Sequence, residues 1–256
     1  MNDKQMARLK AIYEQRKQQS GNKGGSWFWT PPEGKSQIRI LPSSDEDQFF
    51  YKATGIHRID DQNVYCPKLT TGAPCPICET VSKLWASKRP EDITLAKKLK
   101  ARKKFYSNVI VRKLDSDGEV VESDGPYIWT FGVKMLDKLL NYIFDKDFGD
   151  LTSLKNGWDF VVEKGEKDGF PNYDNSKPRV HSTPAGSSDE IADWLERAHD
   201  VYGFVDNNVK SYKEIQAVLL QEDDIDDDTT DDEPEDETDN TSKKVDKSIL
   251  DELNDL

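Results

Sequence analysis

The sequence predicts a β-rich α+β fold: a sheet core with peripheral helices and a small zinc-binding subdomain, flanked by a basic N-terminal arm and a disordered acidic C-terminal tail. Three observations predict this organisation. Short segments of alternating apolar and polar residues stand between turn residues, as strands do. All three cysteines lie between Cys66 and Cys78. Residues 222–256 hold 17 acidic and 3 basic residues, too much charge and too little apolar surface to fold alone.

The charge distribution divides the chain. The net charge of the whole chain is −13, and the tail alone has a net charge of −14. The other 221 residues therefore have a net charge of +1. A near-neutral body with local basic clusters is compatible with a nucleic-acid binder, which the overall acidity would hide. The sequence has no apolar run of membrane-spanning length and no signal-peptide core, so a soluble, intracellular protein is expected.

Residues 1–21 form the predicted arm. Lys4, Arg8 and Lys10 surround an apolar stripe at helical spacing, and a glycine-rich polar run at 20–25 then breaks the pattern. Two interpretations remain: a solvated helix without a role, or a basic arm that docks on a neighbouring subunit or on nucleic acid.

The predicted core spans 22–221. Strands are expected at 36–42, with Arg39 on the face opposite two isoleucines, and at 108–114, 127–131 and 157–163. An amphipathic helix is expected at 133–144. Serine and glutamate three residues apart predict capping boxes for two later helices, at Ser187 and Ser211.

The cysteine cluster predicts a metal site within a subdomain at about 55–90. His57, Cys66, Cys75 and Cys78 offer three thiolates and an imidazole, a set that suits one tetrahedral, structural Zn²⁺. A redox CxxC pair and three buried structural cysteines are the alternatives, and neither suits the surrounding loop residues. His181 could replace His57 as the fourth ligand.

A basic run precedes two aromatic residues. After the acidic start of a helix at 91–104, the sequence becomes cationic and enters a strand. Good helix capping is one explanation, and phosphate binding beside stacking rings is the other. The predicted contacts to single-stranded nucleic acid in this stretch are Lys97, Lys98, Lys100, Arg102, Lys103, Lys104, Phe105, Tyr106 and Arg112.

Several motifs in order carry a resemblance to a known family. They are the His57 and cysteine set, the basic run entering Phe105-Tyr106-Ser-Asn, Trp129-Thr-Phe-Gly, Gly-Phe170-Pro-Asn-Tyr173-Asp, and the acidic tail ending in Leu256. Over essentially its whole length the chain resembles the gene-thirty-two class of helix-destabilising proteins, the single-stranded DNA-binding proteins of T-even-type bacteriophages.

The resemblance implies an OB-type β-barrel with a zinc subdomain and a positive, aromatic-lined cleft for single-stranded DNA. It adds Arg39, Trp129, Phe170 and Tyr173 to the expected DNA contacts. It also implies self-association along DNA through the arm, and a tail that competes with DNA and recruits replication, recombination and repair proteins. Leu250, Leu253 and Leu256, at helical spacing, are the expected partner-binding residues, and the host cytoplasm is the expected location.

Other classes of function are weighed against this one. A zinc enzyme needs an open coordination position, which three cysteines and a histidine do not leave, so no catalysis is expected. A zinc-stabilised protein-interaction module would explain the cysteines and the tail but not the basic and aromatic stretch. An RNA-binding module also remains, because RNA and DNA both offer phosphates and stacking faces.

Overall fold

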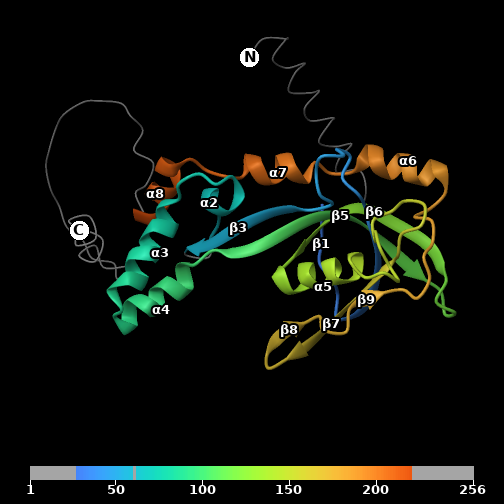
Figure 1. Cartoon of the computed structure of the whole chain (residues 1–256), viewed down its shortest axis with the longest axis horizontal. Helices are drawn as coiled ribbons and strands as arrows, with labels where there is room; N and C mark the ends of the chain where they lie inside the picture. Colours follow the sequence, from blue (N-terminus) through green and yellow to red (C-terminus); the bar gives the residue numbers. More distant parts are fainter. Residues whose placement is uncertain (1–26, 60–61, 221–256) are drawn as a thin grey trace, which may run out of the picture. The chain divides into compact units, whose positions relative to one another are not determined.

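The computed structural model describes residues 27–59 and 62–220, which form two compact units (Figure 1). We call them the sheet unit, with residues up to Thr54 and Lys103–Asn208, and the cysteine unit, with Gly55–Arg102 and residues from Val209. The predicted arm and tail, including Lys4, Arg8, Lys10, Leu250, Leu253 and Leu256, lie outside the described residues. Within the described ranges, every helix is too short or too polar to cross a membrane.

The sheet unit is built on strands in the order β1-β6-β5-β2-β7-β8, with β9 also paired to β7. Only β1 and β6 pair in parallel along this path. The described strands show no pair that joins β1 to β8, so the pairing is that of an open sheet rather than the closed barrel that the resemblance implied. The strands of this path are β1 (Phe28–Trp29), β2 (Gly34–Ile40), β5 (Arg102–Leu114), β6 (Val120–Phe131), β7 (Phe160–Lys167), β8 (Phe170–Asn172) and β9 (Lys177–Pro178).

The register of the sheet separates its two faces. Ile38 stands opposite Val111 on one side and Phe160 on the other. Side chains alternate along a strand, so Ile38 and Ile40 share one face while Arg39 lies on the other, as predicted.

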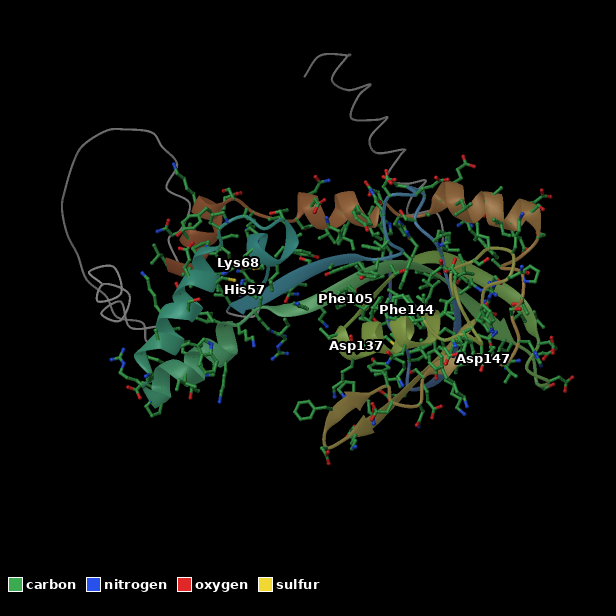
Figure 2. All side chains as sticks on the ribbon, in the orientation of Figure 1. His57, Lys68, Phe105, Asp137, Phe144 and Asp147 are labelled. Carbon is green, nitrogen blue, oxygen red and sulfur yellow. The ribbon has the colours of Figure 1, made fainter. Side chains whose placement is uncertain are left out.

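Helix α5 (Val133–Ile143) covers the isoleucine face. Its buried stripe of Met135, Leu136 and Leu139 packs in one cluster with residues of β2, β5, β6 and β7. The helix ends one residue before the predicted boundary and leaves Phe144 at 79% exposure (Figure 2). The cluster comprises Ile38, Ile40, Phe105, Val109, Trp129, Phe131, Met135, Leu136, Leu139, Leu151, Phe160 and Val162.

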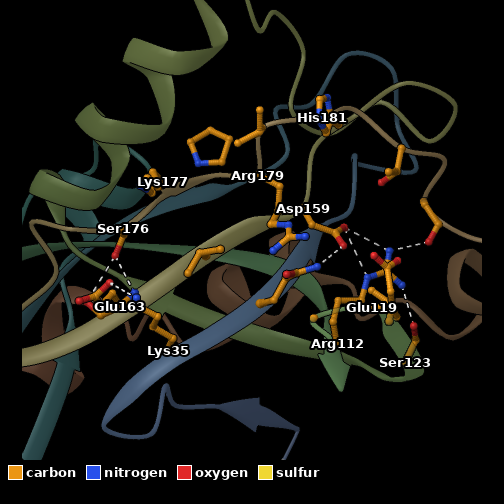
Figure 3. Close-up of a pocket in the computed structure, with 18 of the residues that line it drawn as sticks. Lys35, Arg112, Glu119, Ser123, Asp159, Glu163, Ser176, Lys177, Arg179 and His181 are labelled. Atoms are coloured by element: carbon orange, nitrogen blue, oxygen red, sulfur yellow. Dashed lines mark hydrogen bonds and ion pairs between the residues drawn. The ribbon is translucent and has the colours of Figure 1, made fainter. Parts of the chain in front are cut away.

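The opposite face of the sheet holds a buried ionic cluster of Arg39, Arg112 and Asp159. Figure 3 shows Arg112 and Asp159. The Arg39 guanidinium, with a fully buried side chain, lies 2.7 Å from Asp159 Oδ1, and Arg112 approaches the same oxygen at 3.3 Å. Burial lowers the pKa of Arg39, and the Asp159 carboxylate opposes that effect. The buried Trp194 lies beside this cluster, with the Arg112 guanidinium 5.5 Å from the centre of its ring.

Two helices complete the sheet unit, α6 (Ser188–Arg197) and α7 (Val201–Asn207). Helix α6 begins with the predicted capping box: the Ser187 side chain accepts from the Glu190 N–H, and the Glu190 carboxylate accepts from the Ser187 N–H. The capping box predicted at Ser211 is also present, at the start of α8 in the cysteine unit.

The cysteine unit combines a hairpin with short helices around its own core. Helix α4 ends at Leu99 and β5 begins at Arg102, so the predicted continuous basic helix of 91–104 is wrong. Lys97, Lys98, Lys100 and Arg102 therefore belong to this unit, whereas Lys103 and Lys104 belong to the sheet unit. Its elements are β3 (Lys52–Ile59, which begins in the sheet unit), β4 (Gln62–Tyr65), α2 (Pro67–Thr70), α3 (Pro76–Ser87), α4 (Pro90–Leu99) and α8 (Tyr212–Leu220).

The Asp159→Ala substitution tests the ionic cluster. Removing the carboxylate leaves two buried guanidinium groups without their counter-charge, which should lower the free energy of unfolding by about 3–5 kcal/mol. Urea denaturation followed by circular dichroism measures this. Glu122→Ala, which removes an exposed ion pair with Lys113, is the control and should have a much smaller effect. Equal effects of the two substitutions would contradict the assigned role.

Candidate metal centre and nucleic-acid interface

Four side chains converge in the cysteine unit, where His57 lies beside the sulfur atoms (Figure 2). One potential ligand atom from each of His57, Cys66, Cys75 and Cys78 lies within 4.8 Å of every other. The separations are 3.4 Å between Cys66 Sγ and Cys78 Sγ, and 3.5 and 3.6 Å from His57 Nε2 to Cys75 Sγ and Cys78 Sγ. The alternative ligand His181 lies in the sheet unit and does not belong to this group.

Local structure positions these ligands. Cys75 is the N-cap of α3, and Cys78 lies in the first turn of the same helix, so the CxxC spacing brings their sulfurs together. Cys66 is the N-cap of α2, and its N–H donates to the Gly55 carbonyl at 2.8 Å. A Cβ at Gly55 would lie 2.6 Å from Leu69 Cδ1, so this close approach requires glycine.

The imidazole of His57 is oriented by a backbone carbonyl. Its Nδ1 lies 2.7 Å from the Leu99 oxygen. A carbonyl can only accept, so Nδ1 carries the proton and Nε2 presents its lone pair to the cysteines. Such an outer hydrogen bond is typical of a metal-ligating histidine.

The three thiols perturb one another. A hydrogen bond with Cys75 lowers the pKa of Cys66, whereas that hydrogen bond and burial raise the pKa of Cys75 to about 12. Burial also raises the pKa of Cys78. Crowded, partly buried sulfurs do not readily ionise together, and a divalent cation supplies the positive charge that would stabilise three thiolates.

The donor geometry fits one tetrahedral ion. Zn–S bonds of about 2.3 Å and Zn–N bonds of about 2.0–2.1 Å place tetrahedral ligand atoms about 3.5–3.8 Å apart. The observed separations of 3.4, 3.5 and 3.6 Å lie close to these values. This cluster could therefore hold one metal ion.

A hollow of about 760 Å³ lies beside α5 in the sheet unit. We call it the α5 hollow. Four of the predicted DNA contacts line it, from three separate parts of the chain: Lys104, Trp129, Phe170 and Tyr173. Its other lining residues are Thr130, Phe131, Gly132, Val133, Lys134, Met135, Lys138, Lys167, Asp168, Pro171, Asn172 and Asp174. Trp129 is only 1% exposed and belongs to the core cluster, so its ring is not accessible to a base.

Three lysines in the α5 hollow were not predicted from the sequence. Lys134 and Lys138 lie one turn apart on α5, and Lys167 ends β7. With Lys104 they give four cations against two carboxylates, Asp168 and Asp174. The spacing of the two helical lysines, away from the apolar stripe of α5, was the signal available in the sequence.

A tight turn presents the most exposed aromatic ring of this hollow. Asp168 and Gly169 have φ of 54° and 77°, and Lys167 pairs with Phe170 on either side of them. Two successive residues with positive φ are typical of the two-residue turns of β-hairpins, because the twist of such a turn matches the right-handed twist of the two strands. Phe170 is 73% exposed at the start of β8, so its ring is accessible to a ligand.

The structure places other predicted contacts away from the α5 hollow. Arg39 is fully buried and donates to Asp159 and Thr183, so the prediction that it contacts DNA is wrong: its guanidinium is used within the core. Arg112 is 7% exposed and is held by Asp159, Ser123 and Ala185, which excludes it in the same way.

Phe105 and Tyr106 are also buried, at 6% and 4% exposure. Phe105 stacks on Phe131 with ring centroids 5.8 Å apart, and Tyr106 contacts Phe204. Both rings therefore pack within the protein and are not available to stack on bases. Lys103 is exposed in the sheet unit outside the hollow, and Lys97, Lys98, Lys100 and Arg102 are exposed in the cysteine unit.

Comparison with known proteins agrees with the predicted resemblance. The profile of the family described as "gp32 DNA binding protein like" matches residues 32–221. The single-stranded DNA-binding protein of Enterobacteria phage T4 is 27% identical over 180 residues, and that of Enterobacteria phage T2 is 26% identical over 181 residues; each alignment covers 62% of this chain. The chain spans about 58% of the length of these curated relatives. Because the profile covers well over half of the sequence, the chain belongs to the gp32-like DNA-binding protein family.

Proposed function

We propose that this chain binds single-stranded DNA without reading its sequence, and coats and protects it during replication, recombination and repair. The observation that carries the proposal is the α5 hollow, where four lysines surround accessible aromatic side chains. The names of the two phage relatives favour DNA over RNA.

The mechanism follows from the side chains of the hollow. Lys104, Lys134, Lys138 and Lys167 would bind phosphates and release counterions, which makes the affinity fall with salt. Phe170 and Tyr173 would accept unstacked bases, and every base offers a stacking face. Binding to single strands in preference to duplex shifts the strand equilibrium towards melting by mass action, without a catalytic step.

The cationic residues outside the hollow extend the proposed electrostatic footprint. Lys97, Lys98, Lys100, Arg102 and Lys103 are all exposed and none of them needs a specific geometry to attract a phosphate backbone. We assign them a contribution to affinity and association rate rather than to base stacking.

The remaining parts of the chain have supporting roles in this proposal. The core at 22–221, with its open sheet, would be a variant of the OB-type core. The cluster of His57, Cys66, Cys75 and Cys78 would hold one structural Zn²⁺ that stabilises the cysteine unit. The basic arm, with Lys4, Arg8 and Lys10, would contact the next molecule along DNA in the cytoplasm of an infected bacterium.

The acidic tail is proposed to regulate binding. A polyanion tethered to a cationic surface has a high effective concentration there, so it competes with DNA until a long strand displaces it. Once displaced, Leu250, Leu253 and Leu256 can bind replication proteins as an amphipathic helix.

Phe170→Ala tests the stacking role. Loss of one stacked base, at about 1–3 kcal/mol, should raise the Kd for fluorescent oligo-dT by roughly 5- to 150-fold. Phe144→Ala is the control, because Phe144 is 79% exposed in the same unit and does not line the hollow. If both variants bind like the unmodified protein, the hollow is not the stacking site. An unmodified protein that prefers RNA, or binds no single strand, would favour the RNA-binding or protein-interaction alternative.

Truncation to residues 1–221 tests the tail. The truncated chain should bind oligo-dT more tightly than the full chain, and the difference should shrink as salt screens the competition. Fluorescence anisotropy at two salt concentrations measures both. Tighter binding by the full chain would contradict autoinhibition.

Substitution of the two histidines tests the metal assignment. His57→Ala should lower the zinc bound per chain and expose reactive thiols, whereas His181→Ala should change neither. Elemental analysis and thiol titration are the measurements. Chelation should also lower the melting temperature, because metal binding contributes to folding of the cysteine unit. A melting curve unaffected by chelation would argue against a structural ion.

A further inference from the structure

We propose that a single strand bound in the α5 hollow continues into a second hollow of the sheet unit, where Lys177 and Arg179 bind its phosphates. This inference rests on the proposed function and adds a subsite to it. Neither residue was among the predicted DNA contacts, and the motifs that carry the family resemblance do not include them.

The second hollow has a volume of about 1340 Å³ and lies at the edge of the sheet where β9 pairs with β7 (Figure 3). We call it the β9 hollow. Gln37, Arg112 and Asp159 form its buried floor. Lys177, Arg179 and His181 lie along its exposed rim.

The two hollows are adjacent, because Lys138 and Asp174 line both of them. On one side, Lys134, Lys138 and Tyr142 of α5 follow at intervals of four residues, and such residues lie on one face of a helix. On the other side, the chain from 170 to 181 lines first the α5 hollow and then the β9 hollow. A strand leaving the α5 hollow past Lys138 and Asp174 would reach the β9 hollow by passing the edge of the sheet at β9.

Most carboxylates of the β9 hollow have partners within the protein. Asp159 lies between the two buried arginines, Glu122 pairs with Lys113 at 2.8 Å, and Glu163 pairs with Lys35 at 3.6 Å. The Glu190 carboxylate accepts hydrogen bonds from Ser187, and Asp174 lines the hollow together with Lys138.

The rim cations remain available to a ligand. Lys177 and Arg179 form no ion pair with any other residue in the described part of the chain. The unpaired carboxylate of Glu119 lies across the hollow from Lys177 in Figure 3. The β9-side rim thus offers two free cations to a polyanion.

A second, independent feature indicates a ligand here. Gln37 is 5% exposed and donates from Nε2 to Asp159 Oδ2 at 2.8 Å, so its amide orientation is fixed. Its Oε1 is the one buried side-chain polar atom without a hydrogen-bond partner in the described ranges. Leaving such an acceptor unpaired is costly, and each unpaired DNA base carries an N–H group that could satisfy it.

Length-dependent binding tests the path. In the full-length protein, Lys177→Ala/Arg179→Ala should weaken binding of an oligo-dT of about twelve nucleotides, but not of about four nucleotides, which fills only the α5 hollow. Two lost phosphate contacts should make the slope of log K against log salt less negative by about 1.4 and weaken binding roughly tenfold at physiological salt. Lys146→Ala/Lys155→Ala removes two exposed charges of the same unit outside both hollows, and is the control.

The outcomes separate the two proposals. Equal losses in the two double variants on the long oligonucleotide would overturn the β9 path, as would an equal loss by Lys177→Ala/Arg179→Ala on both lengths. In either case, weaker binding by Phe170→Ala would leave the α5 hollow as the binding site. If the unmodified protein binds neither oligonucleotide, the proposed function itself fails.

Discussion

The sheet unit depends on the carboxylate of Asp159, which lies between two buried arginines on adjacent strands. Without it, Arg39 on β2 and Arg112 on β5 would be buried charges without a counter-charge, because the solvation that they lose is replaced here by close opposite charge and hydrogen bonds. The same contacts join β2, β5 and the segment before β7 on the face of the sheet away from α5. Two members of this ionic cluster, Arg112 and Asp159, also form the floor of the β9 hollow, so the shape of that hollow depends on the cluster.

This cluster also explains where sequence reasoning failed. Arg39 and Arg112 have the residue type that binds phosphate, and nothing local indicates that a carboxylate 120 residues away in the sequence neutralises Arg39. Phe105 and Tyr106 were also predicted to contact DNA but are buried. A strand that is buried on both faces can contain the same aromatic residues as a strand that presents a stacking surface. Which face of a strand is covered depends on tertiary packing, and alternation alone does not determine it.

Other features were predictable because their causes are local. The ligand set, the capping boxes at Ser187 and Ser211 and the apolar stripe of α5 each depend on residues close in sequence. Phe170 and Tyr173, expected to contact DNA through the family motifs, line one hollow, whereas Trp129 is buried behind it. Lys134 and Lys138 were missed because a lysine pair on a solvated helix face is common, and only the position of the β7–β8 hairpin distinguishes this one.

The hydrogen bond between His57 and Leu99 has a consequence for local stability. Leu99 ends α4, and a carbonyl at a helix terminus lacks a partner within the helix. The His57 Nδ1–H donates a hydrogen bond to the Leu99 carbonyl. The same hydrogen bond leaves Nε2 unprotonated, facing the cysteine sulfurs. The end of α4 and the cysteine cluster should thus open together as one cooperative unit in native-state hydrogen exchange. The contact thus ties the end of α4, just before the cationic residues, to a histidine 42 positions earlier in the chain.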